Sequence, residues 1–143
     1  MYNTIQDLVN RLGEKAVIEL SNPFTYGESV NEQVVNAALA DGQALVDSYL
    51  GQRVSLPLTN VPPFVKTLSL DIAVYYLNRN VGKADKESVV VKLYDDAIAH
   101  LKSFAKGETS LGLVIASNDD NNDHAEITSS PRRCTRQILG NLT

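Results

Sequence analysis

Three charged residues near the middle of the chain are the side chains best suited to chemistry. Asp47 and Arg53 flank a predicted helix end, and Asp71 is the lone charge in the apolar run LSLDIAVYYL. General acid–base catalysis uses paired carboxylates, but it also needs a pocket and a nucleophile or a metal. The sequence supplies no such partner, so we expect that the protein is not an enzyme.

The same residues also have a structural interpretation. A charge inside an apolar helix face is destabilising unless an opposite charge pairs with it. Arg53 follows the helix end closely enough to reach back to Asp71, so we predict a structural clamp of Asp47, Arg53 and Asp71. An exposed Asp71, or a contact of Asp71 across a subunit interface, is the alternative. We call the segment DSYLGQRVSLPL, residues 47–58, the joint, because it leads the chain from one helix to the next.

Metal sites have little support in the sequence. The run DDNNDHAEI resembles a calcium-binding loop that begins at Asp119, but His124 stands where that loop needs Gly and Ser130 where it needs Glu. His100, His124 and the single Cys134 are too few and too far apart for a zinc site. We therefore expect no metal and no cofactor.

The C-terminal stretch combines positive charge with apolar side chains. Arg132, Arg133 and Arg136 are suited to phosphate or carboxylate groups, and Ile138 and Leu139 follow them. An apolar pair beside Arg is how a disordered arm gains affinity when it docks and folds on a partner. The sequence predicts a partner-docking arm, and a solvated tail is the alternative.

Helical patterns dominate the first 107 residues. Apolar residues recur at helical spacing in four main segments, with a short segment, EKAVIEL, that adds a turn or two after the first. Thr4 and Gly13 mark the ends of the first helix, and Ser29 with Glu32 forms a predicted capping box at the start of the second. We expect an all-α fold, an antiparallel bundle of about four main helices with a C-terminal extended arm.

Two glycines predict a close helix contact and a helix end in the second main helix. Gly42 lies inside its apolar stripe, where Gly is less stable than Ala by about 1 kcal/mol. We therefore expect another helix to approach closely there. Gly51 follows the last residue, where a left-handed Gly often ends a helix.

Composition limits the class of protein. The 143 residues suffice for one core-forming domain, and 43% apolar and 21% charged residues are typical of a soluble globular protein. No membrane span or secretory signal is visible, which favours a cytoplasmic product. The net charge of −4 argues against a general electrostatic grip on nucleic acid. We expect a helical bundle domain over residues 1–107 and a flexible or partner-docking arm over 108–143, in which SLGLVIAS has the pattern of a short strand.

Four segments together resemble the family of Mu-like phage and prophage head-tail connector proteins: MYNTIQDLVNRLGE, VDSYLGQRVSLPL, LSLDIAVYYL and SSPRRCTRQILG. The resemblance implies an adaptor, or head completion, subunit that assembles in the host cytoplasm and is part of the virion. It implies a ring of identical subunits between the portal protein and a tail completion protein. DNA would only pass through the lumen of this ring, and no membrane would be involved.

A small helical nucleic-acid-binding regulator, using the Arg-rich C-terminus, is the alternative function. Such a protein places a recognition helix in a groove of DNA, and the polar face of that helix should be basic. Neither long helix of the sequence shows such a face.

Overall fold

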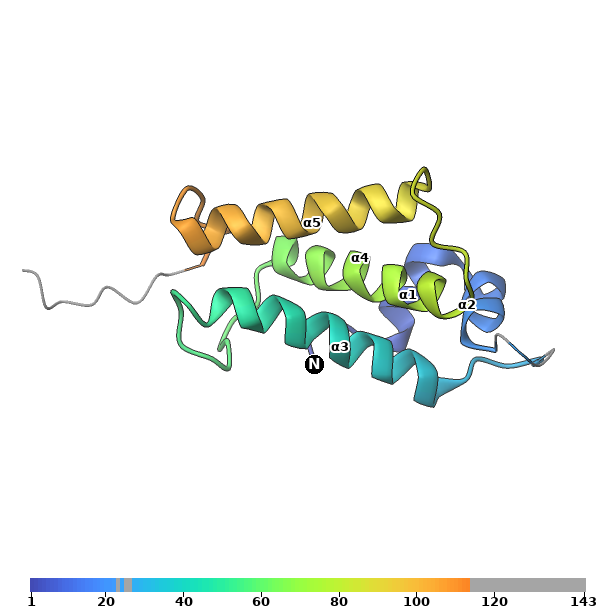
Figure 1. The fold of residues 1–143 in the computed structure, drawn as a ribbon. Helices are drawn as coiled ribbons and strands as arrows, with labels where there is room; N and C mark the ends of the chain where they lie inside the picture. The colour runs from blue at the N-terminus through green and yellow to red at the C-terminus, as the bar shows by residue number, and fades with distance from the viewer. Residues whose placement is uncertain (23, 25–26, 114–143) are drawn as a thin grey trace, which may run out of the picture.

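The computed structural model describes residues 1–22, 24 and 27–113. Over these ranges the chain forms five helices and no strand (Figure 1). The helices are α1 (Ile5–Leu12), α2 (Glu14–Ser21), α3 (Glu32–Leu50), α4 (Pro63–Asn80) and α5 (Val89–Lys106). The predicted all-α bundle is confirmed, and the segment EKAVIEL forms a helix of its own, α2.

The region after α5 is described only in part. Residues 110–113 form a turn in which the N–H of Leu113 bonds to the carbonyl of Ser110 at 2.9 Å. The rest of the predicted strand SLGLVIAS lies outside the described residues. The division into a bundle over 1–107 and an arm over 108–143 stays a prediction.

Hydrogen bonds within four residues fix the start of α1. Thr4 Oγ1 accepts a hydrogen bond from the Asp7 N–H at 3.3 Å, and the Asp7 carboxylate accepts one from the Thr4 N–H at 2.7 Å. This capping box satisfies two N–H groups that the helix leaves free. The bond from Thr4 lowers the pKa of Asp7, because it stabilises the ionised carboxylate. Gly13 follows the helix at φ 85°, so both predicted ends of α1 are confirmed.

The start of α3 differs from the prediction. Its N-cap is Asn31, whose side chain accepts a hydrogen bond from the Val34 N–H at 3.4 Å, so the predicted capping box of Ser29 with Glu32 is wrong. The backbone N–H of Asn31 donates to the side-chain oxygen of Ser21 at 3.1 Å, which anchors the start of α3 to the end of α2. This contact spans ten residues, so the local pattern around Ser29 could not indicate it.

The end of α3 also differs from the prediction. Gly51 has φ −60° and ψ −12°, which is right-handed, so the predicted left-handed turn is wrong. One further right-handed turn follows, in which the N–H groups of Arg53 and Val54 both bond to the Leu50 carbonyl, at 3.0 and 2.9 Å. This turn places Val54 in the core, with 7% of its surface exposed.

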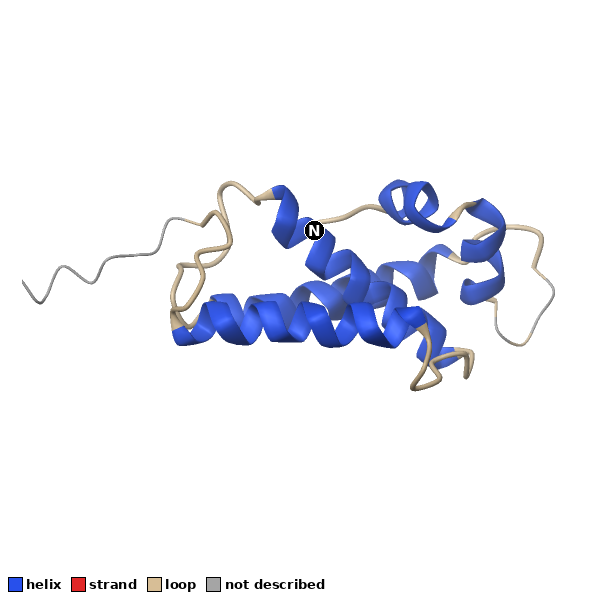
Figure 2. Ribbon diagram, turned by 90° about the horizontal axis from the view of Figure 1, so that it is seen from above, coloured by secondary structure: helices blue, strands red, loops and turns tan. Residues whose placement is uncertain are grey.

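The three long helices form the body of the molecule. α3, α4 and α5 lie side by side, and each runs antiparallel to the one before it (Figure 1). The short α1 and α2 pack at the end of this group that holds the start of α3 and the end of α4 (Figure 2).

Buried side chains form two apolar clusters. The first cluster joins α1 and α2 to α3 and α4, and Leu8 and Val17 are its fully buried members from the short helices. The second cluster joins α3 and α4 to α5 and includes Leu101 and Phe104, which are also fully buried. Tyr76 of α4 packs against both clusters.

α3 and α4 touch through their backbones at Gly42. A Cβ atom on Gly42 would lie 2.7 Å from the carbonyl oxygen of Ser69 and 3.2 Å from the nitrogen of Ala73. Both are backbone atoms of α4, which cannot turn aside as the end of a side chain can. Only Gly permits this approach, so the close contact predicted at Gly42 is confirmed.

Replacing Gly42 by Ala should destabilise the protein even though Ala is the better helix former. The added methyl group forces α3 and α4 apart, and overpacking of this kind costs about 1–3 kcal/mol. Thermal unfolding followed by circular dichroism measures the effect. Asn36→Ala, at an exposed position of the same helix, is the matched control and should leave the melting temperature unchanged or raise it. A melting temperature that does not fall for Gly42→Ala would contradict the contact.

Candidate functional site

Asp47, at the start of the joint, holds the N-terminal end of the chain against α3. Its carboxylate accepts a hydrogen bond from the Tyr2 hydroxyl group and another from Gln43 Nε2 at 3.4 Å. Gln43 Oε1 accepts one from the Tyr2 N–H at 3.2 Å. Burial, together with the bond to the carboxylate, raises the pKa of Tyr2. The hydroxyl group therefore stays protonated at neutral pH and remains a donor to Asp47.

Arg53 ties the joint to the end of α5. Its Nη1 donates a hydrogen bond to the Phe104 carbonyl oxygen at 3.0 Å, and its guanidinium group lies 5.4 Å from the centre of the Phe104 ring. Phe104 belongs to the last turn of α5, where carbonyl groups have no partner within the helix and a positive charge is favourable. Arg53 therefore caps α5, and its predicted pairing with Asp71 is wrong.

Asp71 pairs with Arg11 of α1, at 2.5 Å between Nη2 and Oδ1. Only 8% of Asp71 is exposed, and this burial raises the pKa of its carboxyl group, against the opposing effect of the Arg11 charge. Asp71 thus has the cationic partner that its position requires, but the cation comes from a helix 60 residues earlier. Arg11 stands in the last turn of α1, and the sequence alone does not reveal which helix α1 packs against.

The three predicted clamp residues do not contact one another as a group. Asp47 holds the N-terminal residues, Arg53 holds the end of α5, and Asp71 holds α1. Each ties a different, distant segment to the pair of helices α3 and α4. The residues of the predicted docking arm lie outside the described part of the chain: Arg132, Arg133, Arg136, Ile138 and Leu139.

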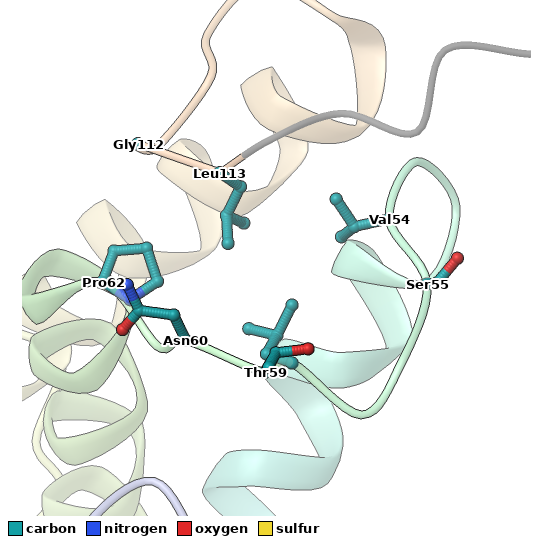
Figure 3. Close-up of a pocket in the computed structure, with 8 residues that line it drawn as sticks. Val54, Ser55, Thr59, Asn60, Pro62, Gly112 and Leu113 are labelled. Carbon is teal, nitrogen blue, oxygen red and sulfur yellow. The ribbon is translucent and has the colours of Figure 1, made fainter.

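A pocket of about 330 Å³ opens beside the joint (Figure 3). Its walls come from the loop between α3 and α4 and from the residues that follow α5. Val54, Ser55, Leu58, Thr59, Asn60, Pro62, Gly112 and Leu113 line it. Sequence reasoning missed this pocket, because its two walls lie about fifty residues apart in the chain and meet only where Arg53 fixes the end of α5.

A group of tyrosines forms a second surface feature. The rings of Tyr75 and Tyr94 stack with centroids 4.0 Å apart, Tyr76 lies 6.4 Å from Tyr94, and the Arg79 guanidinium group lies 4.8 Å from the Tyr76 ring centre. The tyrosines are half-buried, and this burial raises the pKa of Tyr76 and of Tyr94. Tyr and Arg are the residue types enriched in the energetic centres of protein interfaces.

Two observations bear on the chemistry of the described residues. No three His, Cys, Asp or Glu side chains among them lie close enough together to share a metal ion. None of the helices in residues 1–22 and 27–113 is both long and apolar enough to cross a bilayer.

Comparisons with known proteins point to one family. The family model described as "Bacteriophage Mu, Gp36" matches residues 2–129. "Gene product J" of Escherichia phage Mu is 29% identical over 141 residues, which cover 97% of this chain and 97% of the relative. "Mu-like prophage FluMu protein gp36" of Haemophilus influenzae is 34% identical over 128 residues, which cover 88% of this chain and 84% of the relative. The match to the family model thus extends over all five helices and the joint.

Arg11→Met should destabilise the protein at pH 7, because it leaves the buried Asp71 without its cation. We expect a loss of about 1–3 kcal/mol in the free energy of unfolding, the range for a buried polar group left without a partner. Chemical denaturation measures it. Lys15→Met removes an exposed charge from α2 and is the matched control, with no loss expected.

The loss should depend on pH. The pKa of Asp71 is raised above its ordinary value of 3.8, so the folded protein binds this proton more tightly than the unfolded chain does. Ionisation of Asp71 therefore lowers stability as pH rises from 3.8 through the folded-state pKa. Removing Arg11 raises that pKa further, so the deficit of Arg11→Met should shrink on acidification towards pH 4. A deficit equal at both pH values would contradict the role of the pair.

Arg53→Ala should release the last turn of α5. The Phe104 carbonyl loses a charged donor, and we expect a loss of about 1–2 kcal/mol in the free energy of unfolding. Hydrogen exchange read by mass spectrometry should be faster at residues 103–107 and unchanged in α1. Arg53→Lys keeps the positive charge but lacks the planar guanidinium group, so its exchange rates at residues 103–107 should lie between those of the original protein and of Arg53→Ala. Unchanged exchange at the end of α5 in Arg53→Ala would refute the capping role.

Proposed function

The chain belongs to the Bacteriophage Mu Gp36 family, and on this basis we propose that it is a head-tail connector subunit of a Mu-like phage particle. It assembles in the host cytoplasm as a ring that completes the DNA-filled head between the portal and the tail. The observation that carries the proposal is the similarity to gene product J of phage Mu, which covers 97% of both chains. Both relatives have names that give a phage or prophage product and no enzymatic activity.

A connector needs a subunit that keeps its shape under load. The helices α3 and α4 share two apolar clusters, and Asp47, Arg53 and Asp71 each tie an outlying segment to this pair. These contacts join α1, α5 and the N-terminal residues to the pair of helices α3 and α4, which supports a mechanical role.

A closed ring requires two different contact faces on each subunit, because its interfaces are head-to-tail. The cluster of Tyr75, Tyr76 and Tyr94 supplies one face of suitable composition. Leu93 and Val89 of α5 are 37% and 69% exposed and supply another. Leu93 and Tyr94 point about 100° apart on the helix, so the two faces are distinct.

Charge supports a ring that lets DNA slide. The described residues contain 13 Asp and Glu against 10 Lys and Arg, and α3 contains no Lys or Arg at all. A lining of low or negative charge does not hold the phosphate backbone. The same observation disfavours a DNA-binding regulator, which needs a basic helix face.

Electron microscopy of the purified full-length chain, alone and with the cognate portal protein, tests the proposal. We expect closed rings of uniform diameter that stack on the portal. Leu93→Glu should abolish the rings, because it places a charge in an apolar interface, whereas Lys92→Glu on the neighbouring exposed position should not. Monomers under both conditions would refute the connector function, and salt-dependent binding to duplex DNA would favour the regulator.

A further inference from the structure

We propose that the pocket beside the joint receives residues 131–143 of a neighbouring copy of this chain, with Ile138 and Leu139 filling its apolar interior. The inference rests on the proposed ring, because the ring is what places a neighbouring copy beside each subunit. It adds a defined receptor site for the C-terminal residues and a contact that repeats from subunit to subunit.

The pocket is formed before any partner arrives. Val54 is buried, and Leu58 and Leu113 pack against the second apolar cluster, which holds both walls in place. Arg53 fixes the end of α5, from which the second wall extends. Figure 3 shows Val54 and Leu113 on opposite sides of a common space. A site that needs no ordering retains more of its interaction energy as affinity.

The size and lining of the pocket suit a short apolar segment. Its volume of about 330 Å³ lies at the lower end of the range for binding pockets, about 300–1,000 Å³. Leu58 and Pro62 add apolar surface, whereas Thr59 and Asn60 add polar groups that can bond to a peptide backbone. A short segment with two aliphatic side chains next to each other in sequence matches this combination.

Charge also favours the C-terminal residues as the occupant. Residues 131–143 contain Arg132, Arg133 and Arg136 and no Asp or Glu, so they are strongly positive. The described residues have three more acidic than basic side chains. Opposite net charges steer the C-terminal residues towards the described part of a neighbouring copy, and the uncharged lining of the pocket does not oppose them.

The length of the intervening chain allows the contact between subunits. Leu113 is itself part of the pocket wall, and 24 residues separate it from Ile138. When extended, such a segment spans up to about 80 Å, whereas an 18-residue helix such as α5 is about 27 Å long. The C-terminal residues therefore reach the pocket of an adjacent subunit. Exchange of this kind links every subunit to the next, as a head-to-tail ring requires.

The single native cysteine provides the test. Cys134 lies four residues before Ile138 and is the only thiol in the chain, so a benzophenone maleimide labels this position alone. Irradiation of the labelled full-length protein, mixed with isotope-labelled chains, followed by mass spectrometry, identifies which residues of which chain lie beside it. We expect crosslinks between chains, from Cys134 to residues 54–62 or 112–113.

A variant that fills the pocket tests whether the crosslinks depend on the pocket. Asn60→Trp fills the pocket from an exposed position on its rim, and it should reduce these crosslinks about tenfold, because docking otherwise holds the two segments at a millimolar effective concentration. Asn36→Trp, on an exposed position of α3 outside the pocket, should leave them unchanged.

Three other results would overturn the inference. They are crosslinks confined to one chain, crosslinks to other surfaces, and crosslinks that Asn60→Trp leaves unchanged. The outcome is separable from that of the connector proposal. Rings without these crosslinks would support the connector function and refute the docking site. The crosslinks without rings would support the docking site and refute the connector function.

Discussion

The backbone contact at Gly42 sets the distance between α3 and α4, and every other element is placed relative to this pair. With no Cβ between them, the two helices approach until backbone atoms of α4 touch α3. The remaining helices pack on the surface of this pair. The second apolar cluster seats α5 in one region of this surface, and the first cluster seats α1 and α2 in another. A larger residue at the crossing would widen all of these contacts together.

Polar contacts then determine which distant segment goes where. Apolar packing is not directional, so by itself it allows several registers between helices. The bonds from Tyr2 to Asp47, from Arg53 to Phe104 and from Arg11 to Asp71 each match one donor to one acceptor across at least 45 residues of sequence. Burial of Asp71 makes any arrangement without Arg11 costly, which favours a single position for α1.

Features set by neighbouring residues could mostly be predicted from the sequence, with the turn at Gly51 as an exception, whereas most features set by distant contacts could not. Thr4 and Gly13 were assigned correctly because capping depends on residues within a turn or two. Gly42 was informative because a Gly inside an apolar helix stripe needs a compensating contact. The prediction of Ser29 as a cap is wrong, because the hydrogen bond that the Asn31 N–H donates to Ser21 favours Asn31 as the N-cap instead.

The candidate site shows the same limit. The sequence indicated that Asp71 needs a cation and that the joint contains Arg53. It did not indicate which distant group each of these two residues contacts. Arg53 lies within reach of the C-terminal end of α5, and Arg11 within reach of Asp71. The pocket was beyond reach of sequence reasoning because neither wall has a recognisable pattern of its own.

The division of the interior into two apolar clusters also bears on how the protein comes apart. Each cluster has its own set of helices beside the shared pair, and Tyr76 is a side chain common to both. Regions with separate cores open with separate free energies. We therefore expect α1 and α2 to detach as one cooperative unit while α3, α4 and α5 stay folded. In a subunit built in this way, the loss of the end formed by α1 and α2 does not have to unfold the other end.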